Sequence, residues 1–183
     1  MIELRAERNI SLTSVRKEDA KPIYDFYMED KEELKDIFTF VSDDLTLEDE
    51  EGFFEDPGDN HAFVIRLNDK ICGYAVLYDY NDLNNSISIL YYVNSNFRGK
   101  GISTDATKRL LQYAFEELNV NKVVFLINTD NYSSLNLVER LKLRHEGTLL
   151  DNDFANGKYH DQKMYAILKR EYPKLIKTSV KGR

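Results

Sequence analysis

The chain has 183 residues, of which 42% are hydrophobic and 31% charged, a balance that predicts one domain with a buried core and excludes a wholly disordered chain. The formal net charge of −7 disfavours nucleic acid as a partner, because an acidic surface repels phosphates, whereas it suits a cationic acceptor such as an amine. The first residues are too polar for a secretion signal, and no apolar run approaches the ~20 residues of a membrane span. The single cysteine has no partner for an internal disulfide. These features together predict a cytoplasmic protein without membrane contact.

Alternating and helical patterns of apolar residues follow one another along the chain. In chain order we expect a strand over 9–15, a helix with Ala20, Ile23, Tyr24 and Tyr27 on one face, a second helix over 31–40, a short helix and loop within the acidic stretch 42–60, strands over 61–67, 71–80 and 86–93, a helix over 102–118, a strand over 122–127, a helix carrying Leu135, Val138 and Leu141, and strands over 143–150 and 159–168. This order predicts a mixed-sheet α/β fold.

The most informative segment is the turn Asn96-Phe97-Arg98-Gly99-Lys100-Gly101-Ile102, which joins an expected strand to an expected helix. A turn of this kind leaves backbone N–H groups unpaired beside the positive end of the helix dipole, and glycine lets an anion approach the backbone closely. Phosphate or pyrophosphate is therefore the natural ligand, with an ordinary connection as the alternative. The spacing fits neither the three-glycine dinucleotide pattern nor the Gly-Lys-Ser/Thr ending of a triphosphate loop.

The run from Val93 to Thr104 resembles the acetyl-coenzyme A motif of the GNAT superfamily of N-acetyltransferases. Three later segments continue the resemblance in the same order: Thr129 to Ser134 with its Asn-x-x-Ser element, Glu139 to Gly147, and Asn156 to Asp161. The last of them is similar to the terminal hairpin of the branch that acetylates ribosomal-protein N-termini and polyamines. The resemblance extends over residues 9–168, nearly the whole chain.

This resemblance implies a mixed, mostly antiparallel seven-stranded sheet, splayed mid-sheet, with helices on both faces, in one domain over residues 1–170 and a tail over 171–183. Acetyl-coenzyme A would be the co-substrate, its pantetheine paired with the backbone of one strand and its pyrophosphate on the N–H groups of the turn. The residues expected to bind it are Tyr91, Tyr92, Val93, Arg98, Gly99, Lys100, Gly101, Ile102, Ser103 and Asn131.

The resemblance also implies two catalytic groups. The Val93 N–H would stabilise the oxyanion, and Ser134 matches the serine that serves as acid in the ribosomal-protein branch. Capping of its own helix is the alternative role for Ser134, and Tyr132 is the fallback acid. The tyrosine that many relatives use as the acid is replaced here by Val138.

No general base is assigned. The strand before the turn carries Ser86 and Ser88 where relatives often have a glutamate, and Asp161 or Glu146 could equally be solvated strand residues. The three histidines lack metal-ligand spacing, so no metal site is predicted.

Two functions stay open from the sequence. The first is an acetyl-coenzyme A-dependent N-acetyltransferase acting on a primary amine, which could be a protein N-terminus, a polyamine or another small amine. The second is a non-catalytic acyl-coenzyme A-binding sensor or partner-binding module with the same fold. A homodimer is compatible with both.

Overall fold

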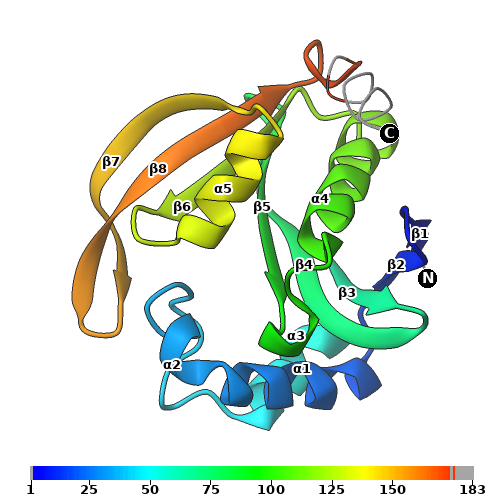
Figure 1. Cartoon of the computed structure of the whole chain (residues 1–183), viewed down its shortest axis with the longest axis vertical. Helices are drawn as coiled ribbons and strands as arrows, with labels where there is room; N and C mark the ends of the chain where they lie inside the picture. Colours follow the sequence, from blue (N-terminus) through cyan, green and yellow to red (C-terminus); the bar gives the residue numbers. More distant parts are fainter. Residues whose placement is uncertain (1, 174, 176–183) are drawn as a thin grey trace.

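The computed structural model describes residues 2–173 and 175, which form both strands and helices (Figure 1). The elements are β1 (Glu3–Arg5), β2 (Ile10–Ser14), α1 (Lys17–Glu29), α2 (Lys31–Leu34), α3 (Leu47–Glu55), β3 (His61–Leu67), β4 (Lys70–Asn81), β5 (Ser86–Val93), the 3₁₀ turn η1 (Ser95–Phe97), α4 (Ile102–Gln112), its π-helical continuation η2 (Tyr113–Glu117), β6 (Lys122–Asn128), α5 (Tyr132–Arg140), β7 (Arg144–Ala155) and β8 (Lys158–Leu168). Among the described residues, every helix is too short or too polar to span a membrane.

One eight-stranded sheet runs through the molecule in the order β1-β2-β3-β4-β5-β6-β8-β7. All neighbouring strands are antiparallel except β5 and β6, whose parallel pairing covers only Ser86 to Ser88 of β5. Beyond Ser88 the two strands diverge, which confirms the predicted splay in the middle of a mixed sheet. The sheet has one strand more than predicted, because the three polar-flanked residues of β1 carry no recognisable alternation.

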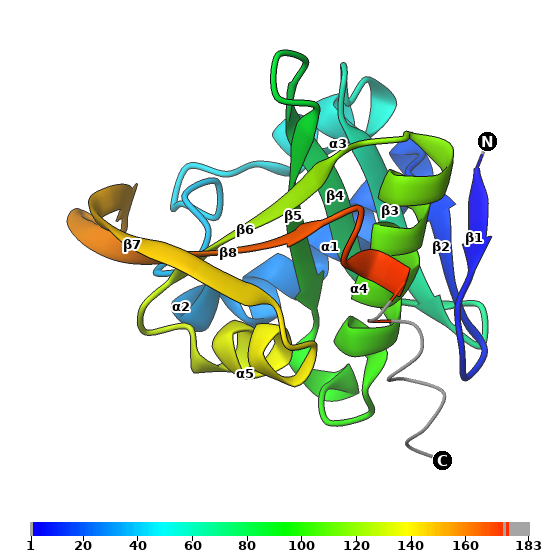
Figure 2. The same ribbon diagram turned by 90° about the horizontal axis from the view of Figure 1, so that it is seen from above.

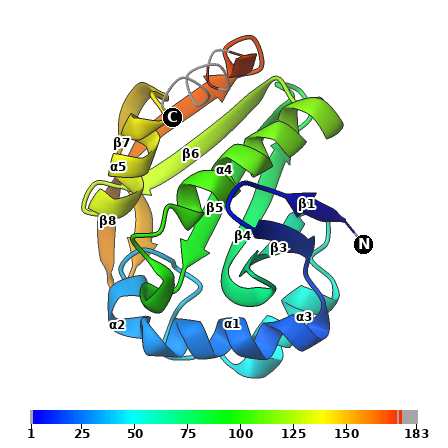
Figure 3. The same cartoon turned by 45° about the vertical axis from the view of Figure 1, so that its right-hand side comes forward.

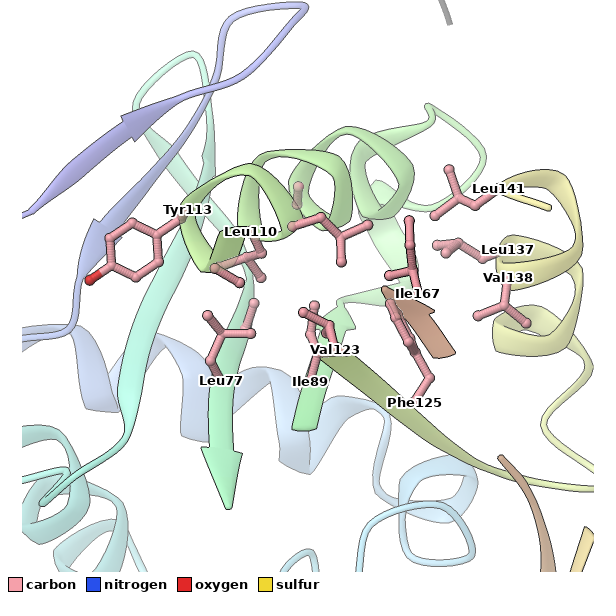
Figure 4. Packing of buried hydrophobic residues seen from close by; sticks show 14 of the residues in the cluster. Leu77, Ile89, Leu110, Tyr113, Val123, Phe125, Leu137, Val138, Leu141 and Ile167 are labelled. Atoms are coloured by element: carbon pink, nitrogen blue, oxygen red, sulfur yellow. The ribbon is translucent and has the colours of Figure 1, made fainter. Parts of the chain in front are cut away.

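The two faces of the sheet bury two separate hydrophobic cores, since successive strand residues point to opposite sides. Phe63 and Ala75 face the core under α4 and α5, and their neighbours Val64 and Val76 face the core under α1 and α3 (Figures 2 and 3). Figure 4 shows the first core, where side chains of α4 and α5 meet those of the central strands. The helices therefore cover both faces, as predicted.

The segment predicted as a helix over residues 31–40 is helical only in α2. The carbonyl of Asp36 accepts a hydrogen bond from the Asn128 side chain at 3.0 Å, and Phe38 then lines a cavity against the sheet. The full-length helix prediction is wrong because this tertiary contact outweighs a local helical pattern.

The last hairpin is longer than predicted, since β7 continues to Ala155. Its turn is tied to the chain after α2, because Asn156 Nδ2 donates to Asp36 Oδ1 at 2.7 Å and Lys158 Nζ lies 3.3 Å from Asp36 Oδ2. The hairpin therefore reaches past β6 toward α2 (Figure 1).

The second residue of the predicted tail is buried. Tyr172 is 8% exposed, and its ring centroid lies 5.1 Å from that of Phe115 in η2. Residue 174 and residues 176–183 of the predicted tail lie outside the described residues.

Candidate active site

The glycine turn exposes a row of backbone donors. Gly99 and Gly101 have φ angles of +77° and +76°, the left-handed region that glycine reaches without strain. The Arg98 N–H donates to the Ser95 carbonyl at 3.3 Å, whereas the N–H groups from Gly99 to Thr104 have no partner among the described residues. Because α4 starts within this row, its dipole adds to the attraction for an anion.

Arg8, a residue that was not predicted from the sequence, contacts the turn and the start of α4. Its Nε and Nη2 atoms lie 2.7 Å and 3.0 Å from the carboxylate of Asp105, a buried residue of α4, and its Nη1 donates to the Lys100 carbonyl at 3.4 Å. The hydrogen bond that Arg8 donates to Asp105 raises the pKa of Arg8. No local signal pairs Arg8 with a turn so distant in sequence.

The two cations of the turn are partly engaged within the protein. Arg98 Nη1 lies 2.7 Å from the Glu33 carboxylate, and its Nε donates to the Val93 carbonyl at 3.1 Å. The Lys100 ammonium lies 5.5 Å from the centre of the Phe97 ring. Arg98 therefore connects the turn to α2 and β5, and its backbone N–H does not belong to the free row.

Asp30 anchors the end of β5 from the other side. Its carboxylate accepts hydrogen bonds from the Tyr92 hydroxyl at 2.7 Å and the Ser95 N–H at 2.9 Å. Burial raises the pKa of Asp30, but these hydrogen bonds and the charge of Arg98 outweigh it and leave the pKa below its usual value. Tyr92, whose backbone was expected to contact the cofactor, lines the cleft, while its hydroxyl is engaged in this structural contact.

The splayed edge of β5 presents free backbone groups. The Asn94 N–H donates to the Cys72 carbonyl of β4 at 3.0 Å, so the alternation of an antiparallel ladder directs the N–H groups of Tyr91 and Val93 to the opposite edge, toward β6. Gly73 supports this end of β5, because a Cβ there would lie 2.2 Å from the Tyr92 carbonyl oxygen. The edge is therefore suited to pair with an extended amide chain.

The start of α5 brings two serines, Ser133 and Ser134, to the same place. Asn131 Oδ1 accepts hydrogen bonds from the Ser134 N–H at 3.1 Å and the Ser133 hydroxyl at 2.9 Å, so Asn131 is the cap and the Ser134 hydroxyl is not used for it. The Tyr91 hydroxyl is buried without a hydrogen-bond partner among the described residues. Burial raises the pKa of Tyr91 to about 12, with a smaller lowering effect from the nearby Ser134. Tyr132, the fallback acid, is 71% exposed.

Two adjoining cavities contain these groups. The first, here called the turn cleft, has a volume of about 220 Å³ and is lined by the glycine turn, the end of β5 and α5. The second, the splay cavity, has a volume of about 260 Å³ and lies where β5 and β6 diverge. Tyr91, Asn131 and Ser134 line both, so the cavities meet at these residues.

Asp153 is the one carboxylate that lines the splay cavity. Its Oδ2 accepts a hydrogen bond from Asn128 Nδ2 at 3.0 Å, and Asn128 Oδ1 accepts one from Gln162 at 2.8 Å. Asp153 follows a register shift in β7, which starts after Leu149, and the sequence offered no sign of this bulge.

The two carboxylates considered as bases lie elsewhere. Glu146 is paired with Lys122 and Arg144, whose hydrogen bonds lower its pKa, and Asp161 accepts a hydrogen bond from the Asp151 N–H at 2.9 Å. Neither lines the turn cleft or the splay cavity. Within the described ranges no three His, Cys, Asp or Glu side chains gather as metal ligands.

The arrangement thus combines a donor row for a diphosphate, a strand edge for an amide-containing arm, and a hydroxyl where that arm would end.

Known proteins resemble this chain in sequence and in fold. Residues 9–144 match the family described as the acetyltransferase (GNAT) domain. The "putative ribosomal N-acetyltransferase YdaF" of Bacillus subtilis is 37% identical over 102 residues, 56% of this chain and 56% of that protein, so the chain spans little more than half of that relative.

Other relatives are matched over different lengths. The ribosomal-protein-serine acetyltransferase of Escherichia coli is 24% identical over 89% of this chain and 94% of its own length, and the spermidine N(1)-acetyltransferase of the same organism is 24% identical over 60% and 59%. Among solved structures, RimL, a ribosomal L7/L12 alpha-N-protein acetyltransferase in complex with coenzyme A, superimposes with a TM-score of 0.84 at 17% identity, covering 91% of this chain and 98% of that one. The chain belongs to the GNAT acetyltransferase family.

Proposed function

We propose that the protein transfers the acetyl group of acetyl-coenzyme A to a primary amine. One observation carries the proposal: the free N–H row of the turn, the free edge of β5 and the Ser134 hydroxyl all line one cleft. These are the groups that a diphosphate, a pantetheine arm and a thioester require, in the order in which coenzyme A carries them. Structures of GNAT relatives contain coenzyme A or acetyl-coenzyme A, which supports acetyl-coenzyme A as co-substrate.

The cofactor assignments follow from this cleft. The pyrophosphate would rest on the N–H groups from Gly99 to Thr104, which include those of Lys100, Gly101, Ile102 and Ser103. The pantetheine would lie along the edge of β5 that Tyr91 and Val93 form. Arg140 of α5 also lines the cleft and has no ion pair with a described residue, so it is available to a phosphate.

The chemistry is direct transfer. The neutral amine attacks the thioester carbonyl carbon, the C–S bond breaks, and the amine loses a proton while the sulfur gains one. The Val93 N–H would stabilise the oxyanion, and the Ser134 hydroxyl would protonate the departing thiolate. A thiol pKa of ~8.5 makes the thiolate a fair leaving group, so this proton transfer is a modest contribution.

We propose that the acceptor amine lies beside Asp153 in the splay cavity. A carboxylate held in place by Asn128 attracts an incoming ammonium and can take its proton directly or through water. Relatives are named for ribosomal-protein and spermidine acetylation, so a protein N-terminal amine and a small amine are both acceptor classes for this chain. The buried, free Cys72 needs no oxidising compartment, in line with a cytoplasmic location.

The test mixes the protein with acetyl-coenzyme A and a panel of N-terminal peptides, polyamines and monoamines, and measures release of free thiol. Turnover of at least one amine is expected. Tight coenzyme A binding without turnover on any acceptor would overturn the proposal and favour the non-catalytic sensor.

A further inference from the structure

A third cavity, here called the Glu50 cavity, opens beside the proposed active site. Its volume is about 490 Å³, and it lies between α1, α3 and the face of β4 and β5. Thr39, Phe40, Tyr78 and Leu90 line both this cavity and the splay cavity, so the two are neighbours. It shares no lining residue with the turn cleft.

A single buried carboxyl lies in this cavity without a partner. Glu50 of α3 is 7% exposed, and it has no ion pair or side-chain hydrogen bond with any described residue. Among the described residues, no Lys, Arg or His lines the cavity. The other acid there, Asp49, is engaged in the capping box of α3, where it accepts a hydrogen bond from the Thr46 N–H at 3.0 Å. A buried charge without a counter-ion is costly, so a cationic ligand would stabilise the Glu50 carboxylate.

The walls of the cavity suit such a cation. Five of the residues around Glu50 are aromatic: Tyr27, Phe40, Phe53, Tyr74 and Tyr78. Aromatic rings attract an ammonium through their π faces, and the low dielectric strengthens its attraction to a carboxylate. Burial raises the pKa of Glu50 to about 7, so the group is ionised at pH 8, where a primary ammonium of pKa ~10.4 is still charged.

We propose that Glu50 binds an ammonium group of the acceptor other than the amine that is acetylated, and so selects acceptors with two amino groups. The inference rests on the proposed function for the position of the reacting amine, which must lie in the splay cavity near Ser134. An ammonium at Glu50 lies beyond Leu90 and Tyr78, outside the cleft that holds the thioester. One molecule can fill both places only if it carries a second amine on a flexible chain.

The test is calorimetric binding at pH 8 without coenzyme. The ligands are α,ω-diamines from 1,3-diaminopropane to 1,8-diaminooctane, each compared with the amino alcohol that replaces one amine by a hydroxyl. For the diamine that binds best, Glu50→Gln is expected to weaken binding at least tenfold, and Glu50→Asp, which keeps the charge, less so. The control Glu48→Gln removes an exposed charge from the same helix and is expected to bind as the wild type does.

Equal affinity of wild type and Glu50→Gln would overturn the inference. So would an amino alcohol that binds the wild type as tightly as its diamine, or the absence of diamine binding. Acetyl transfer is measured separately. Diamine binding that depends on Glu50 without any transfer overturns the proposed function alone, whereas transfer to diamines with the same KM in wild type and Glu50→Gln overturns the Glu50 subsite alone.

Discussion

The Asn131 side-chain oxygen accepts a hydrogen bond from the Ser134 N–H at 3.1 Å, so the cap of α5 is made by Asn131 and not by the serine. Of the two roles considered for Ser134, capping is therefore already filled. The hydroxyl is left at the junction of the turn cleft and the splay cavity. This relationship makes the proposed acid role separable from a structural one.

Ser134→Ala is expected to lower kcat by roughly 10- to 100-fold, at or below the lower limit of the usual range for general acids because a thiolate leaves readily. The thermal midpoint should stay close to that of the wild type, since the cap is retained. Steady-state thiol release and thermal unfolding check both expectations. Tyr132→Phe, which alters an exposed residue outside the cavities, serves as the control and should keep full activity. An unchanged kcat in Ser134→Ala would remove Ser134 from the mechanism.

Gly101→Val is expected to weaken coenzyme A binding at least about tenfold, an effect of about 1.4 kcal/mol. A valine at a φ of +76° is strained, and its Cβ would lie 2.7 Å from the Arg8 guanidinium, so the donor row must shift. Calorimetric titration with coenzyme A measures the effect. The matched control is Gly157→Val in the β7–β8 turn, which has a φ of +73° and open space around the Cβ. A folded Gly101→Val protein with wild-type affinity would contradict the anion site.

The strand–turn–helix unit of the site was predictable because the residues that define it are neighbours in sequence. Gly99 and Gly101 mark the backbone conformation, and Asn131 marks the start of α5. The parts that were missed depend on distant contacts. Arg8 reaches the turn across the sheet, and Asp153 reaches the splay only because β7 bulges.

The acidic stretch shows the same limit. Glu50 lies among other acids in sequence, a pattern that is typical of a solvated charged face. Its burial arises because α3 packs on α1 and β4, with Phe54 in the same core. Periodicity in a short helix cannot single out one carboxylate as buried.

Lys142→Gly is expected to raise the free energy of unfolding by about 0.5–1 kcal/mol. Lys142 follows α5 with a φ of +55°, and its N–H donates to the Glu139 carbonyl while the Leu143 N–H donates to Val138, the pattern of a helix end that favours glycine. A left-handed L-residue costs roughly 1–2 kcal/mol, partly offset by the greater freedom of glycine in the unfolded chain. Urea unfolding measures the change. Lys142→Ala, which also removes the charge but keeps a Cβ, should give no gain, and an equal gain in both would refute the explanation.

Glu50→Gln is expected to stabilise the protein at pH 8 by up to about 3 kcal/mol and to have little effect near pH 4.5. Burial raises the pKa of Glu50 from 4.5 to about 7, so the folded state holds the proton more tightly than the unfolded state does. The wild type therefore loses stability as the pH rises from about 4.5 to about 7, at about 1.4 kcal/mol per pKa unit, and glutamine has no such loss. Urea unfolding across this range measures the difference between the two proteins, and Glu48→Gln should stay within about 0.5 kcal/mol of wild type throughout. If the difference in free energy of unfolding between Glu50→Gln and wild type does not grow with pH, a partner already stabilises the carboxylate. An ammonium would then not be needed to stabilise Glu50.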